Sequence, residues 1–189
     1  MSFLELVGKR QSVRRYLDSP VEREKLARCL EAARLAPSAS NAQDWAFVVV
    51  DDPELKTAVA RETIAPLRSF NTFTDQAPVL VVALTVEPKM VTRTLWRAFG
   101  RDYGLIDIGI AAEHFCLQAV EEGLGTCMLG WFDGKRIKSL LGIPSGPRVD
   151  LVIAVGYPAD STFAPKRRKP LDKIVSYNRY GRSWGGPRG

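Results

Sequence analysis

The sequence predicts one domain on a mixed α/β or α+β plan, with a single sheet layer that carries helices on both faces. Apolar runs of strand length alternate with segments whose apolar residues recur at helical spacing. The chain has 189 residues and is 46% apolar, which suits one domain with its own core. It contains no run of about 18 apolar residues, so we expect no membrane-spanning helix.

The first clearly marked element is a helix within residues 19–36. Ser19 and Glu22 form an S-x-x-E pattern and Pro20 suits a first helical turn, so the sequence predicts a capping box at Ser19. The core-facing side is predicted from apolar residues at helical spacing, namely Leu26, Cys29, Leu30 and Ala33.

Three elements follow this helix in the first half. The run WAFVVV at 45–50 predicts a strand, which the sequence DDP ends, and residues 53–62 predict a short amphipathic helix. Residues 78–86 are apolar at nearly every position, as expected of a central strand that is buried on both faces. Residues 87–103 show no clear pattern.

The second half begins with a long helix predicted at 104–125, which Gly123 and Gly125 end. Because this helix is apolar nearly all round, we expect it in the core or at a subunit interface. A strand, a short helix and a second central-type strand are predicted at 126–131, 134–142 and 148–158. We expect residues 1–180 to form the domain and the Gly- and Arg-rich tail at 181–189 to be mobile.

Cysteine and histidine usage argues against a metal centre. The three cysteines are widely separated and form no CxxC pair, and His114 is the single histidine. We therefore expect neither a disulfide framework nor a dedicated transition-metal site. The N-terminus lacks the charged-then-apolar order of a signal peptide, so we expect a cytoplasmic protein.

The net charge of +6 admits either an anionic partner or a surface that is simply basic. The positive charges gather in residues 8–15 and 165–169, far apart in the sequence. No nucleic-acid-reading motif and no long basic helix accompanies them. Two small basic clusters fit one small polyanion better than a duplex, so we expect no nucleic-acid partner.

The common cofactor and nucleophile motifs are missing. The G-L-G at 123–125 lacks the third glycine of a dinucleotide motif, because position 128 is Met, and it joins a helix to a strand rather than a strand to a helix. Neither a P-loop nor G-x-S-x-G occurs. His114, predicted in mid-helix beside Glu113, suits an interface or half-exposed position better than a catalytic base. If the chain is an enzyme, a cofactor would carry the reaction, and we name no catalytic residue.

The segment RQSVRR at 10–15 places Arg10, Ser12 and Arg14 at alternating positions. In an extended segment these side chains share one face. Two guanidinium groups and a hydroxyl on one face suit a phosphate, since Arg can bind two oxygens at once. The pattern alone is weak, because R-x-S-x-R arises by chance in many basic proteins.

Three further features accompany this segment. The loop PSASNAQDW at 37–45 offers more hydrogen-bonding groups than a plain connector needs. A helix C-terminus and turn explain Pro37 and one serine, but leave Asn41 and Gln43, although either could cap the chain end. A glycine-rich join, EEGLGTCMLGW, follows at 121–131, and KRRKPLDKIV supplies further cations at 166–175.

In this order and around these spacings, the four features resemble the nitroreductase family of FMN-dependent oxidoreductases, over about residues 6–175. The resemblance implies an α+β fold with a mainly antiparallel central sheet and helices on both faces. It also implies an intertwined homodimer, with FMN at the interface and each site built from both subunits.

The resemblance assigns the site residues as well. To the FMN phosphate it assigns Arg10, Ser12, Arg14, Lys166 and Arg168. It places Gln11 near the ribityl chain or the flavin edge. To the flavin ring it assigns a loop reaching across from the partner subunit, with Pro37, Ser38, Ala39 and Asn41. Along the other side of the ring, largely through backbone groups, it places Met128, Leu129 and Gly130.

The chemistry implied is ping-pong transfer of hydride from NAD(P)H, through flavin N5, to a small acceptor such as a nitroaromatic, a quinone or an enal. One alternative keeps the flavin and changes the reaction to dehalogenation, flavin fragmentation or dehydrogenation. Another is a flavin-binding protein without turnover.

The chain departs from the family at Asp44, where Pro is common. This aspartate would either add negative charge near the site or face solvent. Residues 66–76 and 90–103 would form the variable walls of the substrate pocket. Side chains able to meet an aromatic or acidic acceptor there are Phe70, Phe73, Trp96, Tyr103, Arg68 and Arg97. For any single one of the aromatic side chains, packing at the dimer interface is favoured over contact with an acceptor.

Overall fold

The computed structural model describes residues 1–64, 71–86, 102–160 and 165–183. Within them, a four-stranded antiparallel sheet has the strand order β1-β2-β4-β3. The strands are β1 (Trp45–Val50), β2 (Val79–Thr85), β3 (Gly125–Leu129) and β4 (Arg148–Gly156). All four predicted strands are confirmed within two residues, and so is the mainly antiparallel sheet.

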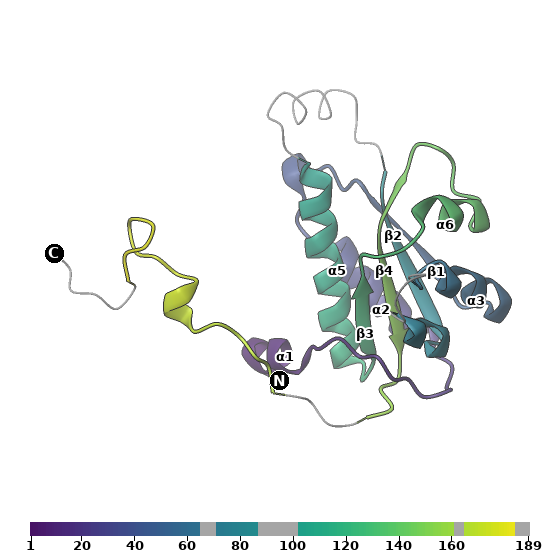
Figure 1. The fold of residues 1–189 in the computed structure, drawn as a ribbon, viewed down its shortest axis with the longest axis horizontal. Coiled ribbons are helices and arrows are strands. Elements are labelled where there is room, and N and C mark those ends of the chain that lie inside the picture. The colour runs from purple at the N-terminus through teal and green to yellow at the C-terminus, as the bar shows by residue number, and fades with distance from the viewer. Residues whose placement is uncertain (65–70, 87–101, 161–164, 184–189) are drawn as a thin grey trace.

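Helices cover both faces of this sheet (Figure 1). Helices α2 (Arg23–Arg34) and α5 (Tyr103–Glu121) pack on one face, and α3 (Pro53–Arg61) and α6 (Gly134–Leu140) on the other. Successive strand residues point to opposite faces, so a strand covered on both sides is apolar throughout. This explains β2, whose Val81 joins the core beneath α2 and α5 while Val82 joins the core beneath α3 and α6.

The predicted start of α2 is wrong. The helix begins at Arg23 with Glu22 as its N-cap, so Ser19 and Pro20 lie outside it. The carboxylate of Glu22 makes no cap hydrogen bond and instead accepts one from the Tyr157 hydroxyl at 2.6 Å. This contact with the residue after β4 replaces the expected capping box. The predicted core side is confirmed for three buried residues, Leu26, Cys29 and Ala33, while Leu30 is partly exposed.

A capping box occurs instead at the N-terminus, where no helix was predicted. Helix α1 (Phe3–Lys9) begins after Ser2, whose hydroxyl accepts from the Glu5 backbone while the Glu5 carboxylate accepts from the Ser2 backbone. The helix buries none of its residues, and Phe3 and Leu4 are 67% and 81% exposed. Within the described residues, nothing covers this apolar helix surface, so it is available to a partner.

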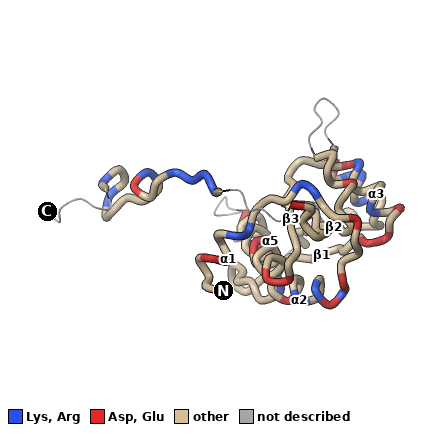
Figure 2. The backbone as a smooth tube through the Cα atoms, turned by 90° about the horizontal axis from the view of Figure 1, so that it is seen from below, with Lys and Arg blue, Asp and Glu red and all other residues tan. Residues whose placement is uncertain are grey.

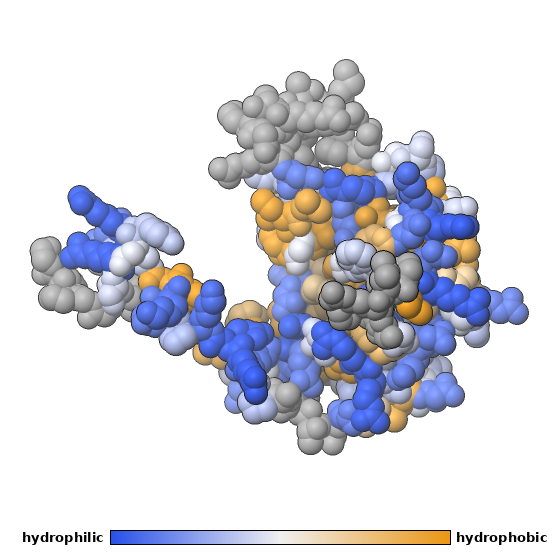
Figure 3. Space-filling model, viewed as in Figure 1, coloured by the Kyte–Doolittle hydropathy of each residue, from blue (hydrophilic) through white to orange (hydrophobic). Residues whose placement is uncertain are grey.

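The long helix α5 is shorter than predicted, since it ends at Glu121 and β3 already begins at Gly125. Gly123 between them has φ +75°, which explains a glycine at this turn. The expectation of a core position is confirmed for one side of the helix, including Phe115 and Ala111. Figure 3 shows an apolar patch over its N-terminal part, where exposed Leu105 and Ile106 lie.

Beyond residue 165 the chain forms an arm that extends away from the body (Figure 1). The arm carries a short 3₁₀ turn, η3 (Leu171–Lys173), and exposes apolar side chains, among them Leu171 at 61% and Ile174 at 65%. Figure 2 shows its first residues as a continuous basic stretch. None of the described helices has the length and apolar character needed to cross a membrane.

Several predictions fall outside the described residues. These are most of the unpatterned segment 87–103, the proposed wall residues Arg68, Phe70, Trp96 and Arg97, and most of the tail. The three cysteines are all described, free and buried.

Candidate functional site

The N-terminal segment lies along the edge strand β3. Ser12 forms a parallel bridge with Thr126, and the Val13 amide donates to the Thr126 carbonyl at 2.9 Å. This approach depends on Gly125, because a Cβ there would lie 2.6 Å from a methyl group of Val13. Tyr16, buried further along, anchors the segment through its hydroxyl, 2.8 Å from the Val13 carbonyl. The segment is therefore fixed before any ligand binds.

Lys166 and Arg168 at the start of the arm lie near Arg10 of this segment, and Arg14 follows four residues later on the same segment. We call Arg10, Arg14, Lys166 and Arg168 the basic cluster. The Lys166 ammonium donates to the Arg10 carbonyl, across 156 residues of sequence. Burial lowers the pKa of Lys166, and the positive charges of Arg10 and Arg168 lower it further. The predicted grouping of the two basic clusters is thus present within one chain.

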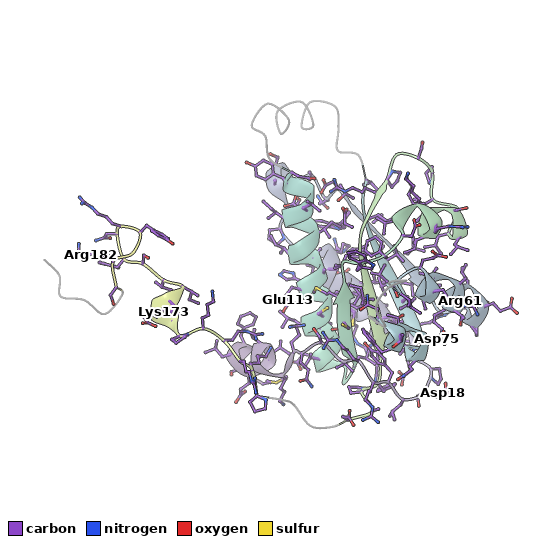
Figure 4. The ribbon with its side chains drawn as sticks, in the orientation of Figure 1. Asp18, Arg61, Asp75, Glu113, Lys173 and Arg182 are labelled. Atoms are coloured by element: carbon purple, nitrogen blue, oxygen red, sulfur yellow. The ribbon has the colours of Figure 1, made fainter. Side chains whose placement is uncertain are left out.

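Glu113 was not predicted to take part in this grouping. Its carboxylate pairs with the Arg10 guanidinium at 3.1 Å, from the middle of α5. Figure 4 labels Glu113 on the side of α5 toward the arm, with Lys173 and Arg182 farther out along it. Because one carboxylate faces several cations, the basic cluster keeps a net positive charge suited to an anion.

A small cleft of about 210 Å³ opens beside the basic cluster, and we call it the β3 cleft. Arg14 lines it on one side, with its guanidinium 5.9 Å from the centre of the Phe73 ring. The predicted residues Met128, Leu129 and Gly130 line the other side. The remaining lining residues, which sequence reasoning did not single out, are Asn71, Cys127 and Trp131.

Cys127 lies at the junction of the cleft and the N-terminal segment. Burial raises the pKa of its thiol, while the charge of Arg14 and a hydrogen bond from Ser12 oppose that shift. Ser12 and Arg14 therefore both influence the same thiol of β3.

The polar loop, residues 37–43, is held in an unusual backbone conformation. Ser40, Asn41 and Gln43 have φ of 54°, 52° and 49°, in the left-handed region that non-glycine residues seldom adopt. Such residues cost about 1–3 kcal/mol each and cluster at ligand-binding loops. Two contacts of backbone amides help to hold the loop. The Gln43 backbone N–H donates to the Ser38 hydroxyl, and the Ala39 backbone N–H donates to the Asp107 carboxylate of α5, both at 3.0 Å.

Some of the loop's polar groups are used within the loop. The Asn41 side-chain oxygen accepts from the Gln43 side chain at 3.0 Å, so these two residues stabilise the turn itself. Local structure therefore explains part of their presence, in line with the alternative that Asn41 or Gln43 caps the end of the chain segment. Pro37 and Ala39 contribute no polar side-chain atom, so any recognition by them uses the backbone or shape.

Asp44, which follows the polar loop, is buried rather than facing solvent, with 2% of its surface exposed. Among the described residues neither of its carboxylate oxygens has a hydrogen-bond partner, and the same holds for the nearby hydroxyl of Thr85. Burial is the main cause that raises the pKa of Asp44, and the neighbouring carboxylates of Asp107, Asp102 and Asp150 raise it further. Gly104 makes room, since a Cβ there would lie 3.1 Å from Asp44 Oδ2.

One chain does not bring the polar loop and the basic cluster together. The loop leads into β1 at one edge of the sheet, whereas the basic cluster lies beside β3 at the other. Strands in a sheet lie about 4.8 Å apart, so two intervening strands and a face of helices separate the two groups. Gln11 stays with the basic cluster, partly buried between Arg10 and Ser12.

The fold and this site can be compared with known proteins. The family model described as "Nitroreductase family" matches residues 7–157. The chain belongs to the nitroreductase family. It is 30% identical over 193 residues to an NADH dehydrogenase of Thermus thermophilus, with 88% of this chain and 91% of that protein covered.

A solved FMN-dependent nitroreductase from Clostridium difficile superposes with a TM-score of 0.77 and 29% identity, covering 94% of this chain and 100% of that one. An iodotyrosine deiodinase of Thermotoga neapolitana is 27% identical over 198 residues, covering 93% of this chain and 97% of that protein. The family contains relatives with different named reactions, so the family alone leaves the acceptor open.

Proposed function

We propose that this chain is an FMN-dependent oxidoreductase that takes hydride from NAD(P)H and delivers it to a small electron acceptor. The carrying observation is the basic cluster, in which the Lys166 ammonium contacts the Arg10 carbonyl while Ser12, between Arg10 and Arg14, is bridged to Thr126 of β3. The names of the Clostridium difficile and Thermus thermophilus relatives support FMN and NADH respectively.

The residues present fit a phosphate-bearing flavin cofactor. Guanidinium and ammonium groups would hold the phosphate by charge-assisted hydrogen bonds, with Arg168 and Ser12 adding donors. The β3 cleft opens next to this cluster, so the backbone of Leu129 and Gly130 would meet the ring edge. Gln11 would lie toward the ribityl chain. Bound there, FMN would supply the redox chemistry, and the chain's own groups would bind and orient it.

We infer that a second copy of the chain completes each site. The polar loop lies at the far edge of the sheet from the basic cluster, so in a dimer the partner would supply Pro37, Ser38, Ala39 and Asn41 to the ring. Exposed apolar residues on α1, on α5 and along the arm offer the interface such a dimer needs. Free, buried thiols suit a reducing cytoplasm.

The first test is the flavin itself. The purified protein should show flavin absorbance bands and release FMN on heating, at about one per chain. Combined Arg10→Ala and Arg14→Ala substitution should empty the site and leave a folded dimer, because the phosphate loses both guanidinium groups. Arg15→Ala is the matched control, since Arg15 points away and pairs with exposed Asp160 at 3.2 Å. Stoichiometric FMN in the double variant would overturn the phosphate assignment.

A second candidate function is reductive dehalogenation, favoured by the similarity to the Thermotoga neapolitana deiodinase. Steady-state oxidation of NAD(P)H with menadione, compared with release of halide from a halogenated phenol, separates the two. Bound flavin with turnover of neither acceptor would favour another flavin reaction or a flavin-binding protein without turnover.

A further inference from the structure

A second, larger cleft adjoins the β3 cleft and shares Trp131 with it. This α6 cleft has a volume of about 820 Å³, within the range of roughly 300–1,000 Å³ that is usual for small-molecule sites. Its walls come from the C-terminal end of α3, the turn after β3, helix α6 and the start of β4. The FMN site proposed above uses the β3 cleft and leaves the α6 cleft without a ligand.

Three cations line the α6 cleft without a carboxylate partner within the described part of the chain: Arg61, Lys135 and Lys138. The Lys138 ammonium donates to the carbonyls of Ser145 and Pro147, at 2.9 and 2.7 Å, which fixes its position without neutralising its charge. Arg61 and Lys135 are exposed, so both can reach a ligand.

The other charged residues of the lining do not cancel this excess. Arg148 is already paired with Asp150 and Asp102. The Asp133 carboxylate caps α6 by accepting from two backbone amides at 3.0 Å, which leaves Glu62 as the one lining carboxylate with no such contact in the described residues. The cleft therefore favours an anion.

Trp131 lies where the two clefts meet and is 67% exposed. An exposed indole beside several cations is the combination that binds a nucleotide, because the ring stacks on a base while the cations hold phosphate. Stacking of a base on an aromatic side chain is worth about 1–3 kcal/mol.

We propose that the α6 cleft binds the adenosine-phosphate half of NAD(P)H. This inference rests on the proposed function, in which the nicotinamide must reach the flavin edge at Leu129 and Gly130. The donor's second half then extends past Trp131, with the adenine against the indole and its phosphates toward Arg61, Lys135 and Lys138. The donor is thus held at two points, and the chemistry is confined to the β3 cleft.

The test uses the flavin-loaded protein with Arg61→Ala and Lys135→Ala combined, compared with Arg136→Ala as control. Arg136 neighbours Lys135 on α6 but does not line the cleft. Three probes are used: NADH, reduced nicotinamide mononucleotide, which lacks the adenosine half, and ADP alone. Flavin reduction is measured as the loss of flavin absorbance, and ADP binding is measured by calorimetry.

We expect the double variant to raise the KM for NADH about tenfold or more, with kcat and the KM for the mononucleotide unchanged, since charge-assisted contacts to phosphate are lost. ADP should bind the wild type and the control alike, and the double variant at least tenfold more weakly. Equal effects on NADH and the mononucleotide, or an equal effect of Arg136→Ala, would overturn the proposal.

Failure of the proposed function gives a different result. A protein that holds no FMN or oxidises neither donor contradicts the oxidoreductase assignment, and the ADP titration still decides the cleft. Wild-type protein that reduces its flavin with NADH but does not bind ADP contradicts the cleft proposal alone.

Discussion

At the scale of single residues, Asp44 shows how the site departs from the rest of the core. A buried carboxylate normally has hydrogen-bond partners, and leaving one without them costs free energy. Asp44 follows the three left-handed residues of the polar loop, so strain and unpaired charge lie together. Structural cost concentrated in one loop is characteristic of binding sites rather than of connectors.

Removing this charge should stabilise the protein at neutral pH. Because burial raises the pKa of Asp44, the folded chain binds this proton more tightly than the unfolded chain. The resulting stability is full below the unfolded pKa of about 3.9 and is lost as pH rises through the folded pKa. Asp44→Asn should therefore raise the free energy of unfolding at pH 7.5 by about 1 kcal/mol, or Tm by roughly 2–4 °C.

Thermal unfolding at several pH values checks this, and the gain should shrink as pH falls toward 4. The control is Asp18→Asn, because Asp18 is exposed and its replacement should change Tm little at any pH. A loss of stability in Asp44→Asn at pH 7.5 would show that the carboxylate is satisfied in solution.

At the scale of elements, the placement of the site depends on the contact between the N-terminal segment and β3. Gly125 allows Val13 to approach the strand, and the Ser12–Thr126 bridge follows from that approach. Arg10 and Arg14 flank Ser12 in the sequence, so this contact determines where they lie. The groups that we propose for phosphate binding are therefore as well fixed as the edge strand that supports them.

Gly125→Ala should disturb the basic cluster without changing any charged residue. The new methyl group would overlap Val13, so the segment must shift, at a cost of about 1–3 kcal/mol. We expect weaker FMN binding by fluorescence titration, and partial recovery when Val13→Ala is added. Gly109→Ala is the control, since a Cβ there meets nothing within 4 Å and should stabilise α5 by up to about 1 kcal/mol. Equal FMN affinity in Gly125→Ala and wild type would contradict this account.

The elements were the part most readily predicted from sequence. The runs at 45–50 and 78–86 are apolar because both faces of the strands are covered, and this leaves a signal in sequence. The start of α2 was mispredicted because Glu22 bonds to Tyr157, a residue 135 positions away. Long-range contacts of this kind leave no local pattern.

The candidate site was predictable to a smaller extent. The alternating spacing of Arg10, Ser12 and Arg14 predicted that they form one group. In the structure Ser12 is bridged to β3 and the Arg10 carbonyl contacts Lys166. The pairing of Arg10 with Glu113 could not be seen, because it depends on which side of α5 faces the N-terminal segment. The roles of all these residues toward a cofactor stay predictions.

At the scale of the whole molecule, the arm and α1 carry apolar surface that the body does not cover. Leu171 and Ile174 lie beyond the basic cluster on a segment that extends away from the sheet, as Figure 1 shows. Single exposed apolar residues are common, but a row of them along an extended arm indicates a partner surface. A second copy is the partner that we propose, because it would also supply the polar loop to the site.

Negative charge introduced on the apolar face of the arm should therefore both weaken the proposed dimer and weaken FMN binding. Combined Leu171→Asp and Ile174→Asp should increase the dimer dissociation constant by at least about tenfold, because two apolar side chains lose their burial. Sedimentation velocity and FMN titration on the same samples measure both effects. Lys173→Asp, on the same turn, is the control for added negative charge. A dimer and FMN affinity unchanged in the double variant would contradict the arm's role.

The contact between Lys166 and Arg10 also sets an order of events during synthesis. These residues are 156 positions apart, so the basic cluster can assemble only after Lys166 has left the ribosome. The sheet and its helices can form earlier, because β4 ends at Gly156. A chain interrupted after Gly156 would thus contain all four strands but lack Lys166 and Arg168, two of the cations that we propose for the FMN phosphate.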